Sequence, residues 1–102
     1  MEATGTAVQM HRAKFAEDLA RAEVEALQKA TERAAEDAKH AFMWRRDDEA
    51  GALRVLADEY GDAYGASRAR LALAEKKYAA LRAELDSALQ RHAQAAAREV
   101  KP

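Results

Sequence analysis

Residues that interrupt helices are almost missing from this chain. The only proline, Pro102, is the last of 102 residues, and the only glycines are Gly5, Gly51, Gly61 and Gly65. The remaining positions are rich in alanine, leucine, glutamate, arginine and lysine, which are strong helix formers. Because little in the sequence can end a helix once it has begun, we predict an all-α protein made of one or two very long helices.

The apolar content is mostly alanine, which limits the core that one chain can build. Hydrophobic residues make up 49% of the sequence, but 28 of them are alanines and none is isoleucine. At roughly 25 cal/mol per Å² of buried apolar area, a thin alanine seam barely offsets backbone entropy. We therefore expect a long antiparallel helical hairpin, or coiled coil, that assembles into a dimeric or higher helical bundle.

The expected domain organisation is a disordered tail over residues 1–5 and a single hairpin domain over residues 6–100. Thr6 is a plausible N-cap for the first helix. Two segments could reverse the chain. Residues 46–51 are favoured because they place aspartates after two arginines near the midpoint, which suits helix capping and the helix macrodipole. Residues 60–65, with two glycines around Asp62, are the alternative.

The second half of the chain carries an apolar heptad repeat. One position recurs through Ala50, Ala57, Tyr64, Leu71, Tyr78, Leu85 and His92, and another through Leu53, Tyr60, Ser67, Ala74, Leu81, Ala88 and Ala95. Such spacing over more than three heptads is typical of coiled-coil packing. We predict that the larger members form a seam for self-association or partner binding: Leu53, Tyr60, Tyr64, Leu71, Tyr78, Leu81 and Leu85.

In the first half, the apolar spacing is less regular. One stripe runs through Phe15, Leu19, Ala22 and Ala26, and a second through Leu27, Ala30, Ala34, Ala38 and Ala41. The phase changes between them near residues 26–30. We interpret the change as a stutter in a single helix whose packing face includes both stripes.

Phe42, Met43 and Trp44 form the most apolar cluster in the sequence. Three adjacent large residues point in three directions around a helix, so one hairpin cannot bury all of them. The cluster either plugs the end of the bundle or forms a docking patch for another subunit. We predict the docking patch.

Charge is uneven along the chain. Residues 1–65 carry nine Lys or Arg and fourteen Asp or Glu, whereas residues 66–102 carry eight and four. Attraction between two antiparallel arms explains this pattern most simply. The alternative is a nucleic-acid-associated oligomer with a basic arm, which would use Arg68, Arg70, Lys76, Lys77 and Arg82. In outline the chain resembles the oligomerisation hairpins of phage small terminases, without their helix-turn-helix, and the coiled-coil stalk proteins of flagellar and type III secretion machines.

A metal site is the least favoured possibility. Glu36, Asp37 and His40 loosely resemble the Glu-x-x-His element of ferritin-like bundles, with Asp in the Glu position. The second half offers no matching inward-facing glutamates, so we expect neither metal nor cofactor.

The sequence also lacks the features of several functional classes. It has no cysteine, no phosphate-binding glycine loop, no secretory signal and no apolar run near the ~18 residues of a membrane span. We therefore expect a cytoplasmic, non-enzymatic structural or adaptor protein. It would bind copies of itself or another helical protein, plausibly in a bacterial secretion or phage assembly machine.

Overall fold

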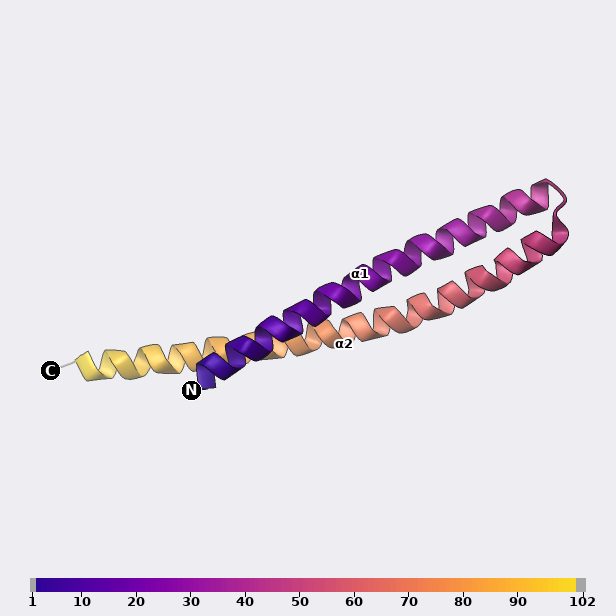
Figure 1. Ribbon diagram of the computed structural model, residues 1–102. Coiled ribbons are helices and arrows are strands. Elements are labelled where there is room, and N and C mark those ends of the chain that lie inside the picture. Colours follow the sequence, from indigo (N-terminus) through magenta and orange to yellow (C-terminus); the bar gives the residue numbers. More distant parts are fainter. Residues whose placement is uncertain (1, 101–102) are drawn as a thin grey trace. The chain divides into compact units, whose positions relative to one another are not determined.

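The computed structural model describes residues 2–100, and the side chains of residues 4–99 (Figure 1). It contains two long helices, α1 (Glu2–Met43) and α2 (Asp47–Val100). Within the described chain only Trp44, Arg45 and Arg46 lie outside them. The helices form a hairpin, so the predicted all-α helical hairpin is confirmed.

Backbone hydrogen bonds at the end of α1 form a Schellman motif. The amide of Arg46 donates to the carbonyl of Ala41 at 2.8 Å, and the amide of Arg45 donates to the carbonyl of Phe42 at 3.1 Å. Arg45 adopts the left-handed conformation that the motif requires, with φ of 58°. The arrangement satisfies carbonyl groups that the helix end would otherwise leave without partners.

Helix α2 begins directly after this motif. The carbonyl of Arg46 accepts the first α2 hydrogen bond, from the amide of Ala50 at 2.8 Å. Asp47, Asp48 and Glu49 occupy the first turn, where negative charge stabilises a helix N-terminus. The reversal therefore occupies residues 44–46, at the N-terminal edge of the favoured segment 46–51.

Two expectations about helix ends need correction. Residues 60–65 are helical, since α2 continues through them and no described glycine has a positive φ. Residues 2–5 are also helical, so Thr6 lies inside α1 and is not its N-cap; Met1 lies outside the described residues. The reason is the same at both sites: an isolated glycine costs only about 1 kcal/mol in a helix, which is too little to end one.

The described chain divides into two units, each built from both helices. One unit, which we call the turn unit, comprises residues 19–72. The other, the terminal unit, comprises residues up to 18 together with those from 73 onward. Each has its own seam between α1 and α2, and each is described separately.

In the turn unit, the buried side chains of the seam are small. Ala34, Ala38 and Ala41 are buried on α1, together with Ala50 at the start of α2. Ser67 is the most buried side chain described, at 1% exposure, and its hydroxyl donates to the carbonyl of Tyr64 at 2.9 Å. The α2 side is completed by half-buried residues at the predicted heptad positions: Leu53, Ala57, Tyr60, Tyr64 and Leu71.

In the terminal unit, α1 contributes Thr6, Met10, Ala13 and Glu17 to the seam, and all four are buried or half-buried. The carboxylate of Glu17 lies 3.6 Å from the Lys14 ammonium group, although only 6% of the residue is exposed. Half-buried residues of α2 continue the heptad on the other side: Ala74, Tyr78, Leu81, Leu85 and Ala88. Beyond this point the heptad residues His92 and Ala95 are exposed.

The predicted packing face of the first helix is half wrong. Leu27, Ala30, Ala34, Ala38 and Ala41 are buried or half-buried as expected, but Phe15, Leu19, Ala22 and Ala26 are exposed. The buried positions instead follow one unbroken 4-3 spacing without a stutter: Thr6, Met10, Ala13, Glu17, Ala20, Val24, Leu27, Thr31, Ala34, Ala38 and Ala41. Glu17, Thr6 and Thr31 are polar, so the hydrophobicity of the sequence does not reveal this stripe.

Candidate functional site

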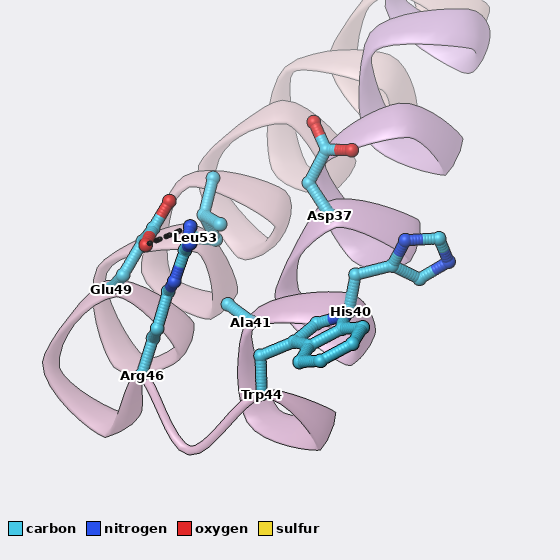
Figure 2. A pocket seen from close by; sticks show the side chains of 7 residues that line it. All are labelled: Asp37, His40, Ala41, Trp44, Arg46, Glu49 and Leu53. Carbon is cyan, nitrogen blue, oxygen red and sulfur yellow. Dashed lines mark ion pairs between the residues drawn. The ribbon is translucent and has the colours of Figure 1, made fainter.

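A groove of about 540 Å³ lies beside the helical turn, within the turn unit (Figure 2). Its walls come from three places. Asp37, His40 and Ala41 lie on the last turns of α1, Trp44 and Arg46 lie in the connection, and Glu49 and Leu53 lie on the first turns of α2. The Schellman motif positions this site, because it fixes how the connection leaves α1.

The groove carries one ion pair between its own lining residues. The guanidinium of Arg46 lies 3.6 Å from the carboxylate of Glu49, as the dashed line in Figure 2 shows. His40 Nε2 lies 3.1 Å from Glu36 Oε1, one turn earlier on α1. Both pairs are solvent-exposed, so each contributes less than about 1 kcal/mol to stability. The groove therefore combines the Trp44 indole with this ion pair, the His40 imidazole and the Asp37 carboxylate.

The predicted docking patch is exposed but does not form one surface. Trp44, at 77% exposure, lines the groove described above. Phe42 lines a different groove of about 390 Å³, which shares no described lining residue with the first. That second groove is formed by Ala35, Ala38, Lys39, Phe42, Arg54, Ala57 and Asp58. Met43 is also exposed and lines neither groove. The three consecutive side chains therefore point in three different directions.

All seven predicted seam residues are half-buried within their own units. In the terminal unit, the Lys14 ammonium group lies 5.3 Å from the ring centre of Tyr78. In the turn unit, the Arg68 guanidinium lies 5.7 Å from the ring centre of Tyr64. These cation–π contacts cover ring surface that the helix pair itself leaves accessible. The seam is thus used at least in part by the hairpin's own packing.

The basic residues of the nucleic-acid alternative are divided between the two units. In the turn unit, Arg70 forms an ion pair with Glu23 across the two helices, and Arg68 lies on the ring of Tyr64. Lys76, Lys77 and Arg82 belong to the terminal unit. In the turn unit, therefore, both cations of this set already have contacts within the hairpin.

The possible metal ligands all lie near the end of α1. Glu36 and His40 pair with each other, and Asp37 and His40 both line the turn groove. Over the described part of the chain, no group of three or more histidine, aspartate or glutamate side chains is placed to hold a metal ion. Neither α1 nor α2, over the same residues, combines the length and apolarity that a membrane span requires.

Sequence reasoning missed the exposed apolar residues of α1 outside the turn. Phe15 is 67% exposed and Leu19 is 56% exposed, and Val8 is exposed further toward the N-terminus of α1. On α2, Val55, Leu73 and Leu89 are exposed as well. The signal for Phe15 and Leu19 was present as an apolar stripe, but the sequence alone did not say which of two stripes faces α2.

Comparison with known proteins adds no assignment, because no family model, curated protein or solved structure matches this chain.

Proposed function

We propose that this chain is a non-enzymatic structural or adaptor protein that self-associates and docks helical partners. The observation that carries the proposal is the amount of apolar surface that the hairpin leaves uncovered. Among residues 4–99, nine large apolar side chains are exposed: Val8, Phe15, Leu19, Phe42, Met43, Trp44, Val55, Leu73 and Leu89.

The turn is the proposed site for a different partner. Trp44 and Phe42 are the largest exposed aromatic side chains of the turn unit, and tryptophan is enriched among residues that dominate binding energy. Each borders its own groove, so a helical partner could insert a side chain on either side of the hairpin end. The setting we propose is a cytoplasmic bacterial secretion or phage assembly machine.

Light scattering across a concentration series tests self-association. We expect a molar mass of at least twice the 11.2 kDa monomer at high concentration, with helical circular dichroism retained. A mass of one chain at every concentration, with full helicity, would remove self-association from the proposal.

A variant pair tests docking at the turn. Trp44→Asp should abolish capture of a partner that the wild-type protein retains, whereas Val55→Asp should not, because Val55 is exposed in the same unit but lines neither groove. Equal capture by wild type and both variants would exclude the turn as the docking site.

A further inference from the structure

In the turn groove, a carboxylate and an aromatic ring lie on one face of the end of α1. Asp37, Ala41 and Trp44 line this groove, and steps of four and three residues place them on the same side of the helix (Figure 2). The amide of Trp44 donates to the carbonyl of His40 at 3.0 Å, so the helical path of the backbone extends as far as Trp44. All of these residues belong to the turn unit.

The hairpin itself uses neither of these two side chains. Asp37 is exposed, and its carboxylate forms no hydrogen bond or ion pair with any described residue. Trp44 is 77% exposed, and its ring takes part in neither of the cation–π contacts found on Tyr64 and Tyr78. A carboxylate and an indole face are the two groups that bind cationic side chains most readily.

The charges around the turn groove are mostly negative. Arg46 is the one lysine or arginine among the described lining residues, and it is already paired with Glu49. His40 Nε2 lies 3.1 Å from the carboxylate of Glu36. Three carboxylates therefore share one guanidinium and one imidazole, and Asp37 is the carboxylate that has no partner.

Other cations near the end of α1 do not line this groove. Lys39 lines the separate groove beside Phe42, and Arg33 and Arg45 line neither of the two. Arg33 lies one turn before Asp37 but forms no ion pair with it. A positively charged group from another molecule would therefore complement the charge of the turn groove.

We propose that the turn groove binds an arginine-rich segment of a partner protein. One arginine stacks on the indole of Trp44, and a second pairs with the carboxylate of Asp37. Two are needed because seven residues of helix separate these side chains, a rise of about 10.5 Å. Arginine fits better than lysine, since its planar guanidinium both stacks on aromatic rings and pairs with a carboxylate through two parallel hydrogen bonds. Ala41 and Leu53 supply apolar surface for the arginine stems.

This inference names the chemistry of the partner proposed to dock at the turn, and so rests on that docking. Trp44 is the only tryptophan of the chain, so its fluorescence reports on this groove directly. Titration with a hexa-arginine peptide at physiological ionic strength should give a saturable change in emission, and a hexaglutamate peptide should give none. No change with hexa-arginine, or a saturable change with hexaglutamate, would overturn the inference.

A pair of matched variants separates this groove from general attraction between charges. Asp37→Asn and Asp62→Asn each remove one exposed carboxylate from the turn unit, but Asp62 lines neither groove. Asp37→Asn should raise the dissociation constant for hexa-arginine by about three- to tenfold, and Asp62→Asn by less than about twofold. An equal rise for both variants would show that the peptide senses only the overall charge, and would overturn the inference.

Failure of this inference can be told apart from failure of docking at the turn. Absence of a response to hexa-arginine contradicts the arginine chemistry alone, and leaves the turn open to a partner of different chemistry. Equal partner capture by the wild type, Trp44→Asp and Val55→Asp contradicts docking itself, whatever the peptide does.

Discussion

Two residues show how local chemistry shapes the hairpin. Arg45 holds a left-handed conformation at the end of α1, a position that glycine usually occupies. Glu17 is buried in the seam of the terminal unit at a position that coiled coils normally give to an apolar side chain. At both positions another amino acid should give a more stable protein. The gain in the free energy of unfolding can be measured for each.

Replacing Arg45 with glycine should stabilise the protein. The left-handed conformation costs an L-residue roughly 1–2 kcal/mol, and glycine avoids most of this strain. We expect Arg45→Gly to raise the free energy of unfolding by about 1 kcal/mol in urea denaturation at fixed protein concentration. Arg46→Gly is the control and should stabilise nothing, because Arg46 has no positive φ. Equal effects of the two variants would contradict the Schellman assignment.

Replacing Glu17 with methionine should also stabilise the protein. Replacing a buried ion pair by apolar side chains is often neutral or gains about 1–4 kcal/mol, and here the partner Lys14 is partly exposed and keeps its ion pair with Asp18. Asp18→Asn is the control, since Asp18 contacts the same lysine at 3.3 Å but is exposed, and it should change stability by less than about 0.5 kcal/mol. Thermal unfolding of both variants measures the difference. If Glu17→Met destabilises the chain, the carboxylate stabilises the seam in a way that burial does not explain.

The two helices differ in how far the sequence predicted them. In α2, the leucines and tyrosines at heptad positions from Leu53 to Leu85 predicted the packing face. All of them are half-buried in the structure. In α1, the face toward α2 mixes apolar and polar residues. Its buried and half-buried positions include Leu27 and Ala34 but also Glu17 and Thr31, whose hydroxyl donates to the carbonyl of Leu27 at 2.7 Å. Hydrophobicity alone selected Phe15 and Leu19, which lie on the outside.

The geometry of the two helices explains which features of the site could be predicted from the sequence and which could not. The three-residue apolar cluster was recognisable as exposed, because adjacent side chains diverge on any helix. Its division between two grooves was not recognisable, because that depends on where α2 passes beside the end of α1. The chain reverses beside residues 46–51, the segment that the sequence favoured, because charges of opposite sign meet there. The two glycines at residues 61 and 65 are not enough to end helix α2.

Leu71 and Leu73 form a matched pair for testing the α2 face. Leu71 is half-buried and Leu73 is exposed, two positions apart on the same helix. Leu71→Ala should cost about 1–2 kcal/mol, less than a fully buried leucine, and Leu73→Ala less than about 0.5 kcal/mol. Urea denaturation at one protein concentration measures both. Similar losses from the two variants would show that the assigned heptad is not the packing face.

The glycines of α2 give a second prediction for this helix. A Cβ atom added at Gly61 or Gly65 would meet nothing within 4 Å, and neither glycine has a positive φ. Gly61→Ala/Gly65→Ala should therefore stabilise the chain by about 1–2 kcal/mol through helix propensity. If thermal melting instead shows destabilisation, a molecule outside this chain approaches the glycines closely.

For the molecule as a whole, the central question is how a chain with so little buried surface remains folded. Ser67 is the largest side chain with less than 2% exposure among the described residues, and it is a serine. The buried apolar residues described are all alanines. A seam of this kind gives a marginal hairpin, so we propose that a second molecule supplies the missing burial.

The concentration dependence of the melting temperature tests this account most directly, because association stabilises the folded state by mass action. Circular dichroism melts over a wide range of protein concentrations should show a midpoint that rises steadily with concentration. A midpoint that stays constant over that range would show that the single hairpin is stable alone, and would contradict the account.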